Sequence, residues 1–217
     1  MKNKKFNKIK NMSEIIISVC LVIILLPIIL AALIISFIET GTNPIFIQLR
    51  GLSIDGKLFK LYKIRTIKPN VNVRFNAGRR FLLSPGYKED VPKLSKIIRQ
   101  LGIDELPQLI NVIKGEMSLI GPRPLDIFDL EQLSELFPKE NKKRSELTSK
   151  PGIIGMWQLY GKRIKGAEDL LYWDSIYEEN FSFLFDIEII LETFIFYIKT
   201  RKKEDSIFEQ KISFEIK

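Results

Sequence analysis

The stretch from Ile15 to Ile38 constrains this chain most, because its 24 residues carry no charge and are mainly Ile, Leu and Val. A helix of this length reaches about 30–36 Å, enough to cross the hydrocarbon core of a bilayer. The apolar region of a signal peptide is about half as long, and no small-residue cleavage site follows, so we expect the segment to be retained as a membrane anchor. A buried helix of a soluble core is the alternative.

The charges on both sides of this segment leave its topology open. Five lysines precede it and place the N-terminal side in the cytoplasm: Lys2, Lys4, Lys5, Lys8 and Lys10. The stretch after it is also basic, from Arg50 to Lys68, so a simple span would place a second basic stretch outside. Pro27 lies near the middle and lacks a backbone N–H donor. It either bends a spanning helix or breaks the helix so that both ends return to one face.

The charge and the rare residue types limit the chemistry of the rest. The net charge is +8 over 217 residues, which suits an anionic partner such as phosphate, acidic lipid or nucleic acid. There is no histidine, which excludes histidine-based triads and general bases. Cys20 is the only cysteine, so the chain forms no internal disulfide, and a reducing compartment is expected. No P-loop, dinucleotide fingerprint or nucleic-acid-binding module is found.

Beyond the turn Thr40–Pro44, the pattern predicts two strands and then helices. Ile45–Leu49 and Leu58–Ile64 are expected to pair through a turn at Asp55-Gly56, and Lys68–Asp90 to be mainly loop. Apolar residues at helical spacing predict a helix that Gly102 ends: Leu94, Ile97, Ile98 and Leu101. The run Asp104-Glu105-Leu106-Pro107 predicts the start of another helix that ends at Gly115. We expect one apolar face on it, made of Leu106, Leu109, Ile110 and Ile113.

The second half contains more irregular structure. Gly121-Pro122-Arg123-Pro124 predicts a rigid, non-helical corner, and Lys139–Lys150 a solvated helix and loop. Pro151–Gly161 is expected to be irregular. Phe183–Lys199 predicts a final helix rich in aromatic residues, which fits either a core or a membrane interface. The charged tail Thr200–Lys217 is expected to add little to the core.

Three groups of residues have side chains suited to phosphate chemistry. Asp104 and Glu105 lie at an expected helix start, where a carboxylate acts as a nucleophile, metal ligand or base, or else only caps the helix. Arg99 and Arg123 flank them and offer planar donors to phosphoryl oxygens. Lys63 lies on a strand whose cations alternate, which alone fits an edge strand with solvated charge.

Taken in order, these segments resemble the bacterial sugar transferase family of monotopic phosphoglycosyl transferases. The longest matching run is IDELPQLINVIKGEMSLIGPRPL from Ile103 to Leu125, and PGIIGMWQLYG follows from Pro151 to Gly161. The family pattern also includes the strand Tyr62–Thr66 and a later set that this chain carries: Asp174, Tyr177, Asn180, Ser182 and Asp186. The resemblance extends to about Thr200, and such a series is far more specific than any one motif.

The resemblance implies transfer of a phosphosugar from a nucleoside diphosphate sugar, expected to be a UDP-sugar, to polyprenol phosphate, with release of UMP. It implies that Asp104 is the nucleophile and forms an aspartyl-phosphosugar, with Glu105 assisting nearby. Lys63, Arg99 and Arg123 match the family's cationic positions and are expected to bind phosphate or nucleotide. Mg²⁺ is expected, with Asp104 among its ligands. Lys150 stands where the family usually has an arginine, which puts the substrate grip there in doubt.

The resemblance also implies the fold class and location. We expect an α+β, mostly helical catalytic domain with a short β-hairpin, and an N-terminal broken, re-entrant membrane helix with its break at Pro27. The expected divisions are residues 1–44 for the basic N-terminus and membrane helix, 45–199 for the catalytic domain and 200–217 for the tail. The catalytic domain is expected on the cytoplasmic face of a bacterial inner membrane.

The expected role is the first membrane step of a surface glycan, with membrane lipid but no nucleic acid among the partners. The sequence leaves open the sugar, the polyprenol length, and whether the chain is a monomer or a homo-oligomer. Two other functions compete with the enzyme: a membrane-attached basic binding module and an inactive scaffold of the same fold.

Overall fold

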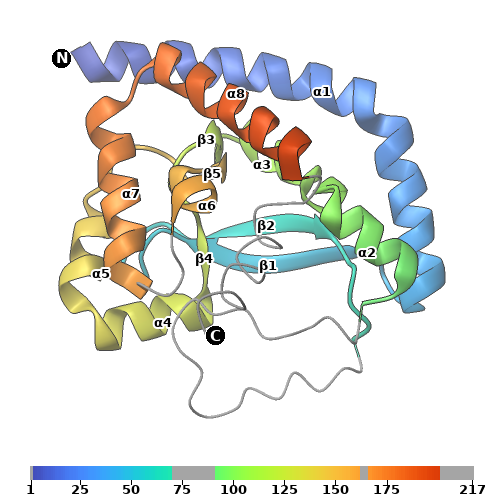
Figure 1. Ribbon diagram of the computed structural model, residues 1–217. Coiled ribbons are helices and arrows are strands. Elements are labelled where there is room, and N and C mark those ends of the chain that lie inside the picture. Colours follow the sequence, from blue (N-terminus) through green and yellow to red (C-terminus); the bar gives the residue numbers. More distant parts are fainter. Residues whose placement is uncertain (1, 70–90, 162–165, 201–217) are drawn as a thin grey trace.

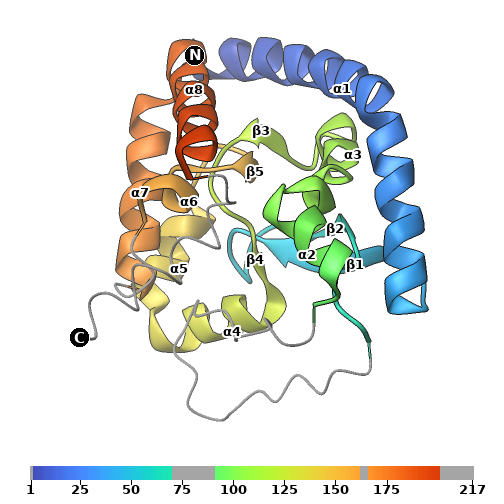
Figure 2. The same ribbon diagram turned by 45° about the vertical axis from the view of Figure 1, so that its right-hand side comes forward.

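The long apolar segment forms most of one continuous helix in the computed structural model, which describes residues 2–69, 91–161 and 166–200. Helix α1 runs from Lys2 to Thr40 and contains Pro27 without interruption. Figures 1 and 2 show that α1 bends strongly, so that its two halves lie along different sides of the molecule. The part from Ile9 to Thr40 is long and apolar enough to cross a membrane, and only 11% of its most apolar window is buried. The expected anchor is therefore an exposed apolar helix rather than a buried core helix.

The predicted hairpin is confirmed. Strand β1 (Ile45–Gly51) pairs antiparallel with β2 (Phe59–Ile64), in a register from Ile45 opposite Ile64 to Arg50 opposite Phe59. The short strand β4 (Leu125–Asp126) joins the other edge of β1, giving the order β2-β1-β4. The loop expected at 68–90 and the tail expected at 200–217 fall almost entirely outside the described residues.

Helix α2 (Lys93–Gln100) confirms the predicted helix but not a buried apolar face. Only Ile98 among its predicted apolar residues is buried, and the others are about half exposed: Leu94, Ile97 and Leu101. Its first turn is capped from α1, because the carboxylate of Glu39 accepts hydrogen bonds from the N–H groups of Leu94 and Ser95. Helix α2 is thus attached to α1 while exposing apolar side chains.

Helix α3 (Gln108–Ile113) is shorter than predicted, and of its predicted apolar face Leu109 is buried but Ile110 is not. Ile110 is 43% exposed, whereas Asn111 is fully buried. The Asn111 amide donates to Lys60 O at 2.7 Å and accepts from the N–H of Tyr62 at 3.2 Å. An amide can pair with both backbone groups of strand β2, which a leucine cannot do, and this explains why a polar residue lies on the inner face.

The segment predicted to be irregular, Pro151–Gly161, contains a strand and a helix. Strand β5 (Gly152–Ile154) runs parallel to β3 (Ser118–Ile120), and α6 (Met156–Tyr160) follows. The prediction of irregular structure is therefore wrong for most of this segment. Each element is only three to five residues long, and a run that short carries no periodicity that sequence could reveal.

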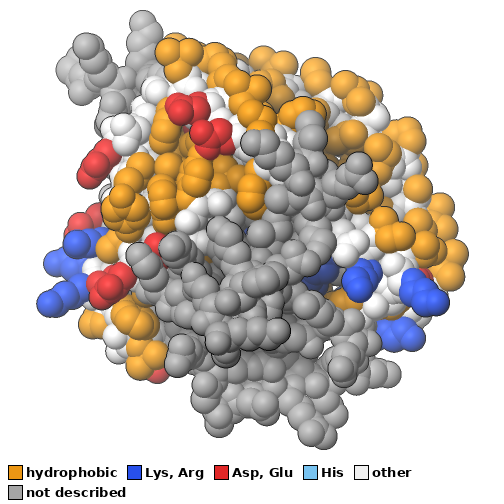
Figure 3. Space-filling model, viewed as in Figure 1, with side chains coloured by type: hydrophobic (Ala, Val, Ile, Leu, Met, Phe, Trp, Pro, Cys, Tyr) orange, Lys and Arg blue, Asp and Glu red, His pale blue; other side chains and the backbone are white. Residues whose placement is uncertain are grey.

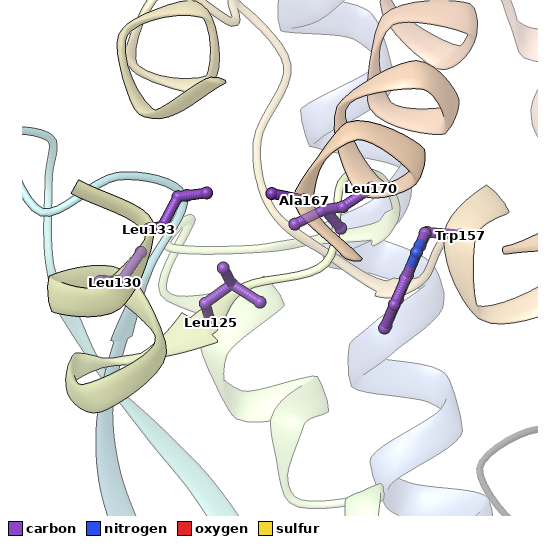
Figure 4. Close-up of a cluster of buried hydrophobic side chains, with 6 residues drawn as sticks. All are labelled: Leu125, Leu130, Leu133, Trp157, Ala167 and Leu170. Atoms are coloured by element: carbon purple, nitrogen blue, oxygen red, sulfur yellow. The ribbon is translucent and has the colours of Figure 1, made fainter. Parts of the chain in front are cut away.

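The remaining helices enclose the core. They are α4 (Ile127–Leu136), α5 (Pro138–Ser145), α7 (Gly166–Asn180) and α8 (Phe183–Thr200), the last of which confirms the predicted final helix. Figure 4 shows one buried cluster, in which side chains from β4, α4, α6 and α7 meet: Leu125, Leu130, Leu133, Trp157, Ala167 and Leu170. The chain is thus mostly helical around small sheets, as predicted.

The first half of α1 is attached to this domain through a buried polar cluster. Lys10 is only 5% exposed, and its Nζ lies 2.6 Å from Asp186 Oδ2. The same Nζ donates to the Tyr177 hydroxyl at 2.8 Å. One turn later, Glu14 accepts from Ser118 Oγ at 2.7 Å. Lys10, which the sequence groups with the membrane-flanking lysines, therefore forms an internal ion pair.

The second half of α1 is attached at a separate place. Ser36 Oγ donates to Arg65 O at 2.6 Å. Ala32 packs in a buried cluster with Ile64 of β2 and Ile98 of α2. Both halves of the apolar helix thus contact one and the same domain.

The face seen in Figure 3 carries a broad apolar area in its upper part, where α8 and α1 lie in Figure 1. Helix α8 contributes side chains that are more than half exposed: Phe183, Leu184, Leu191 and Phe194. Apolar areas of this kind on a protein surface mark a contact with a protein or a membrane.

Candidate active site

Asp104 and Glu105 lie in a separate turn between α2 and α3, rather than at the start of a long helix. Gly102 ends α2 with φ +67°, a conformation that favours glycine, and a 3-10 turn follows over Ile103–Glu105. The N-cap of α3 is Pro107, so the predicted helix start at Asp104 is wrong by one short turn. Asp104 is 5% exposed in this turn, and the side chain of Glu105 is 15% exposed.

Strand β2 brings Lys63 to this turn. Lys63 Nζ lies 2.8 Å from Glu105 Oε1, and both side chains are less than one fifth exposed. Asn111 fixes the position of β2 relative to α3 through its bonds to the strand backbone. Lys63 therefore lies at the turn that carries Asp104 and Glu105, although 40 residues separate it from the turn in the sequence.

Arg123 lies in a turn whose backbone is tightly constrained. The turn Gly121–Pro124 connects β3 to β4, and the N–H of Gly152 donates to Pro122 O at 2.9 Å. A Cβ atom on Gly121 would lie 2.2 Å from Lys150 O, so only glycine fits there. The rigid, non-helical corner predicted for this motif is confirmed.

Arg50 connects Arg123 electrostatically with the carboxylate group. Burial lowers the pKa of Arg50, the charge of Arg123 lowers it further, and the acidic groups of Asp126, Asp129 and Glu105 oppose this. Arg50 is therefore close enough to Arg123 and to these carboxylates for their charges to affect its pKa. Arg50 stays protonated at any physiological pH and adds a positive charge to the site.

Arg99 and Lys150 stand apart from this group. Arg99 lies in the last turn of α2, and no hydrogen bond or ion pair joins its side chain to Lys63, Asp104, Glu105 or Arg123 within the described part of the chain. Lys150 Nζ lies 3.6 Å from where a Cβ on Gly115 would be, and burial lowers the pKa of Lys150.

The later residues of the motif series have structural contacts. Tyr177 and Asp186 belong to the cluster around Lys10. Asp174 is 2% exposed and lies 2.9 Å from Arg144 Nε. Two further members stabilise helix ends: Ser182 Oγ accepts from the N–H of Phe185, and Asn180 donates to Ile176 O.

Two arginines near the site were missed by sequence reasoning. In the sequence, Arg50 is one of the basic residues after the apolar segment, and Arg144 lies in a stretch predicted to be a solvated helix and loop. That assignment is wrong for Arg144, which is 1% exposed, and for Asn141, which is 4% exposed and bonds to Ser53 and Asp55. For Arg50, the one signal in the sequence is its position two residues after Gln48, which places both side chains on the same face of β1.

A magnesium ion at this turn would have Asp104 as its protein carboxylate and would need further oxygen ligands from a bound substrate. No three Asp, Glu, His or Cys side chains lie close enough to hold a metal within the described ranges. Mg²⁺ is often held by one or two carboxylates together with phosphate oxygens, so the buried Asp104 carboxylate suits it once a diphosphate is present.

Comparison with known proteins identifies relatives. The model of the family described as bacterial sugar transferase matches residues 5–200. "Uncharacterized sugar transferase EpsL" of Bacillus subtilis is 36% identical over 151 residues, covering 70% of this chain and 68% of that protein. "Exopolysaccharide production protein ExoY" of Sinorhizobium fredii is 31% identical over 198 residues, covering 85% and 83%.

A longer relative has a more specific name. "Undecaprenyl-phosphate galactose phosphotransferase" of Salmonella typhimurium is 33% identical over 150 residues, covering 64% of this chain and 30% of that protein. This chain thus spans most of the shorter relatives and less than a third of this longer one.

Proposed function

This chain belongs to the bacterial sugar transferase family and is an enzyme of the phosphoglycosyl transferase class, and on that premise we propose its reaction. It transfers a phosphosugar from a nucleoside diphosphate sugar, most simply a UDP-sugar, to polyprenol phosphate and releases UMP. The observation that carries this proposal is the group at the 3-10 turn, where the buried Asp104 adjoins the Lys63–Glu105 pair. The name of the Salmonella relative supports the lipid acceptor.

The proposed reaction has two displacements at phosphorus. An Asp104 carboxylate oxygen attacks the sugar-bearing phosphorus, the bond from that phosphorus to the UMP oxygen breaks, and UMP leaves with the electron pair. An oxygen of polyprenol phosphate then attacks the same phosphorus, and the bond to Asp104 breaks. The products are polyprenol diphosphosugar and a regenerated carboxylate, so no proton or oxidant is consumed.

The cationic residues have the role of stabilising charge that develops on the phosphoryl oxygens. Lys63 is held by Glu105 at 2.8 Å, so its ammonium group is already oriented when a diphosphate binds. Arg123 extends from a fixed turn and offers a planar donor pair. Preorganised donors of this kind contribute most of the catalysis in phosphoryl transfer. Arg99, half-buried in the last turn of α2, is proposed to contact the nucleotide.

Mg²⁺ is proposed as the cofactor, with Asp104 and the substrate diphosphate as ligands. When bound, it would neutralise charge on the diphosphate oxygens. Glu105 is proposed to assist by keeping Lys63 oriented, since the two side chains form an ion pair.

The proposed location is the cytoplasmic face of a bacterial inner membrane, with α1 entering and leaving one leaflet through the bend of a continuous helix rather than through the predicted break at Pro27. Support comes from the bend of α1 in Figure 2 and from the two separate contacts of α1 with the domain. The exposed apolar side chains of α2 and α8 fit a lipid surface beside α1. The division at residues 44 and 199 and a role at the start of a surface glycan are part of this proposal.

The deciding experiment is a screen of UDP-sugars for UMP release by the full-length protein with undecaprenyl phosphate and Mg²⁺. We expect turnover with at least one donor, and Asp104→Asn to lower it by at least about 1,000-fold, because the nucleophile is removed. The matched control is Asp169→Asn, which changes another buried carboxylate on α7 and should keep activity. Full activity of Asp104→Asn would contradict the covalent mechanism.

A different result would support one of the competing functions. Retention on anionic vesicles with a steep salt dependence, and no UMP release from any donor, would favour a basic binding module. If the protein neither binds to vesicles nor releases UMP, the remaining function is an inactive scaffold of the same fold.

A further inference from the structure

Two arginines from different elements donate to consecutive carbonyl oxygens of the turn that carries Arg123. Arg144 Nη2, from the last turn of α5, donates to Arg123 O at 2.6 Å. Arg50 Nη1, from β1, donates to Pro124 O at 2.9 Å. We call this arrangement the arginine clamp. It fixes the backbone on which the Arg123 side chain is mounted.

Arg144 is the fully buried half of the clamp. Its guanidinium forms an ion pair with Asp174, 2.9 Å from Nε to Oδ2, and neither side chain is more than 2% exposed. Burial raises the pKa of Asp174 to about 6, although Arg144 opposes that rise. A buried ion pair gives little net stability, because desolvation offsets the attraction. Stability alone is therefore a weak reason for a guanidinium at this place.

Arg50 is the partly exposed half. Its Nε and Nη2 both donate to Gln48 Oε1, at 3.1 and 2.8 Å, which leaves Nη1 aimed at Pro124. The nearest acidic oxygen, on Asp126, lies 3.8 Å from Nη2. Arg50 places three separate nitrogen donors, held in one plane, on Gln48 Oε1 and Pro124 O, and the single nitrogen of a lysine cannot reproduce that arrangement.

The geometry of the sheet explains why both arginines reach this turn. Strand β4 follows the turn directly and pairs with β1, with Arg50 opposite Asp126. Helix α5 packs against α7, which provides Asp174. The clamp therefore joins the hairpin, the turn and the helical layer at one point.

We propose that Arg50 and Arg144 are positioning residues for the reaction, holding the Arg123 backbone so that its guanidinium meets the substrate diphosphate. This rests on the proposed function, in which Arg123 binds that diphosphate. Neither arginine needs to touch the substrate. Each acts through Arg123, so its effect on catalysis should depend on the presence of the Arg123 side chain.

A double-mutant cycle on the full-length protein tests this dependence. In the wild-type background, Arg50→Gln is expected to lower kcat/KM for UMP release by about tenfold or more, because a misplaced phosphate donor loses transition-state contact. In the Arg123→Ala background, the same change is expected to alter kcat/KM by less than about twofold. Equal losses in both backgrounds, or no loss in the wild type, would overturn the proposal.

The control is Lys60→Gln, which removes one positive charge from an exposed position on β2 with no side-chain contact to the turn in the described structure. It should leave kcat/KM within about twofold of wild type. If Arg50→Gln does not fold, Arg50→Lys takes its place in the cycle. Arg144→Lys gives a second, independent cycle with Arg123→Ala.

A binding measurement separates failure of the clamp from failure of the proposed function. The same cycle is run on the affinity of the protein for inorganic diphosphate, measured by calorimetry, which requires no turnover. Weaker binding in Arg50→Gln only when Arg123 is present supports the clamp even if no sugar donor reacts. Diphosphate binding that is absent, or that does not depend on Arg123, overturns it.

Discussion

Lys63 and Glu105 show how one ion pair can prepare a site for an anion. Their atoms lie 2.8 Å apart, and both side chains are more than four fifths buried. A lysine on a flexible stem loses rotational freedom when it binds phosphate, and a partner that already holds it reduces that loss. The pair also lies beside Asp104. Without the charge of Lys63, a negative diphosphate would meet the carboxylates of Asp104 and Glu105 here.

We therefore predict that Lys63→Met lowers kcat/KM for UMP release by about 100-fold, which is typical for loss of one preorganised charged donor. Lys63→Arg should retain more activity, since it keeps the charge. The measurement is UMP release in detergent at saturating polyprenol phosphate.

Lys60→Met is the matched change on the same strand, because Lys60 is exposed and lies three positions away. It should keep nearly full activity. Lys63→Met with wild-type kinetics would remove Lys63 from the site.

The residues of the site could be selected from the sequence only through the series of motifs. Residue type and spacing alone left Asp104 as a plausible helix cap, and they gave no reason to bring Lys63 to it. The structure does so because Asn111 binds the backbone of β2. Arg50 and Arg144 were missed because their contacts are with carbonyl oxygens of Arg123 and Pro124, and a sequence does not show which backbone atoms a side chain reaches.

Among the elements, the close approach of the Gly121–Pro124 turn to strand β5 depends on the absence of two side chains. A Cβ on Gly121 would lie 2.2 Å from Lys150 O, and one on Gly152 would lie 2.1 Å from the Gly121 nitrogen. Both neighbours are backbone atoms that cannot rotate away. The Arg123 turn and strand β5 can therefore approach this closely only because Gly121 and Gly152 carry no side chain.

Gly121→Ala is accordingly expected to lower the free energy of unfolding by about 3 kcal/mol or more, the upper end of the range for overpacked sites. Gly56→Ala is the control, because its Cβ would meet nothing nearer than Ser53 O at 3.4 Å. Denaturant unfolding in detergent measures both. Equal stability of the two variants would mean that the close approach of this turn to β5 can relax at little cost.

A second element, the segment before Lys150, is attached to α7 by Glu178. The carboxylate accepts hydrogen bonds from the N–H groups of Thr148 and Ser149 at 2.9 and 3.1 Å. Burial alone would raise the pKa of Glu178, but the hydrogen bonds from these two residues outweigh it, and the pKa lies below its ordinary value. The charged form is thus favoured by folding.

The sign of the pH effect follows from this shift. A lowered folded-state pKa gives stability that is present above the ordinary glutamate value, about 4.3, and is lost as the pH falls through the folded-state pKa. We predict that Glu178→Gln is less stable than wild type by about 1 kcal/mol at pH 7, and that the difference shrinks below pH 4. Thermal unfolding at several pH values measures this; a difference that is independent of pH would assign the loss to packing.

Element prediction succeeded where a pattern was long enough. The hairpin and the final helix were predicted nearly to the residue, since β1, β2 and α8 each contain several periods of their pattern. Burial was harder to predict. Helix α5 reads as a solvated charged stretch, yet Asn141 and Arg144 turn inward because the hairpin turn and the Arg123 turn offer them partners.

At the scale of the whole molecule, the two attachments of α1 bear on how the chain meets a membrane. Lys10 contacts Asp186 and Tyr177, and Ser36 contacts Arg65. A straight helix would separate Lys10 from Ser36 by about 39 Å, more than the thickness of the hydrocarbon core. A spanning α1 would place these two attachments on opposite sides of the bilayer, whereas one compact domain holds both. The proposed re-entrant arrangement keeps both attachments and places the 3-10 turn with Asp104 on the same side as the two ends of α1.

Cysteine labelling can decide between the two arrangements. In a Cys20→Ser background, we predict that neither Asn3→Cys nor Asn43→Cys reacts with a membrane-impermeant maleimide in intact spheroplasts, and that both react after permeabilisation. Lys60→Cys in the catalytic domain is the internal control and should follow Asn43→Cys in both conditions. A spanning helix with a cytoplasmic N-terminus would instead expose Asn43→Cys in intact spheroplasts while Asn3→Cys stays protected. That result would mean that at least one of the two attachments does not form in the membrane. It would also mean that α1 does not hold Asp104 at the cytoplasmic surface in the proposed way.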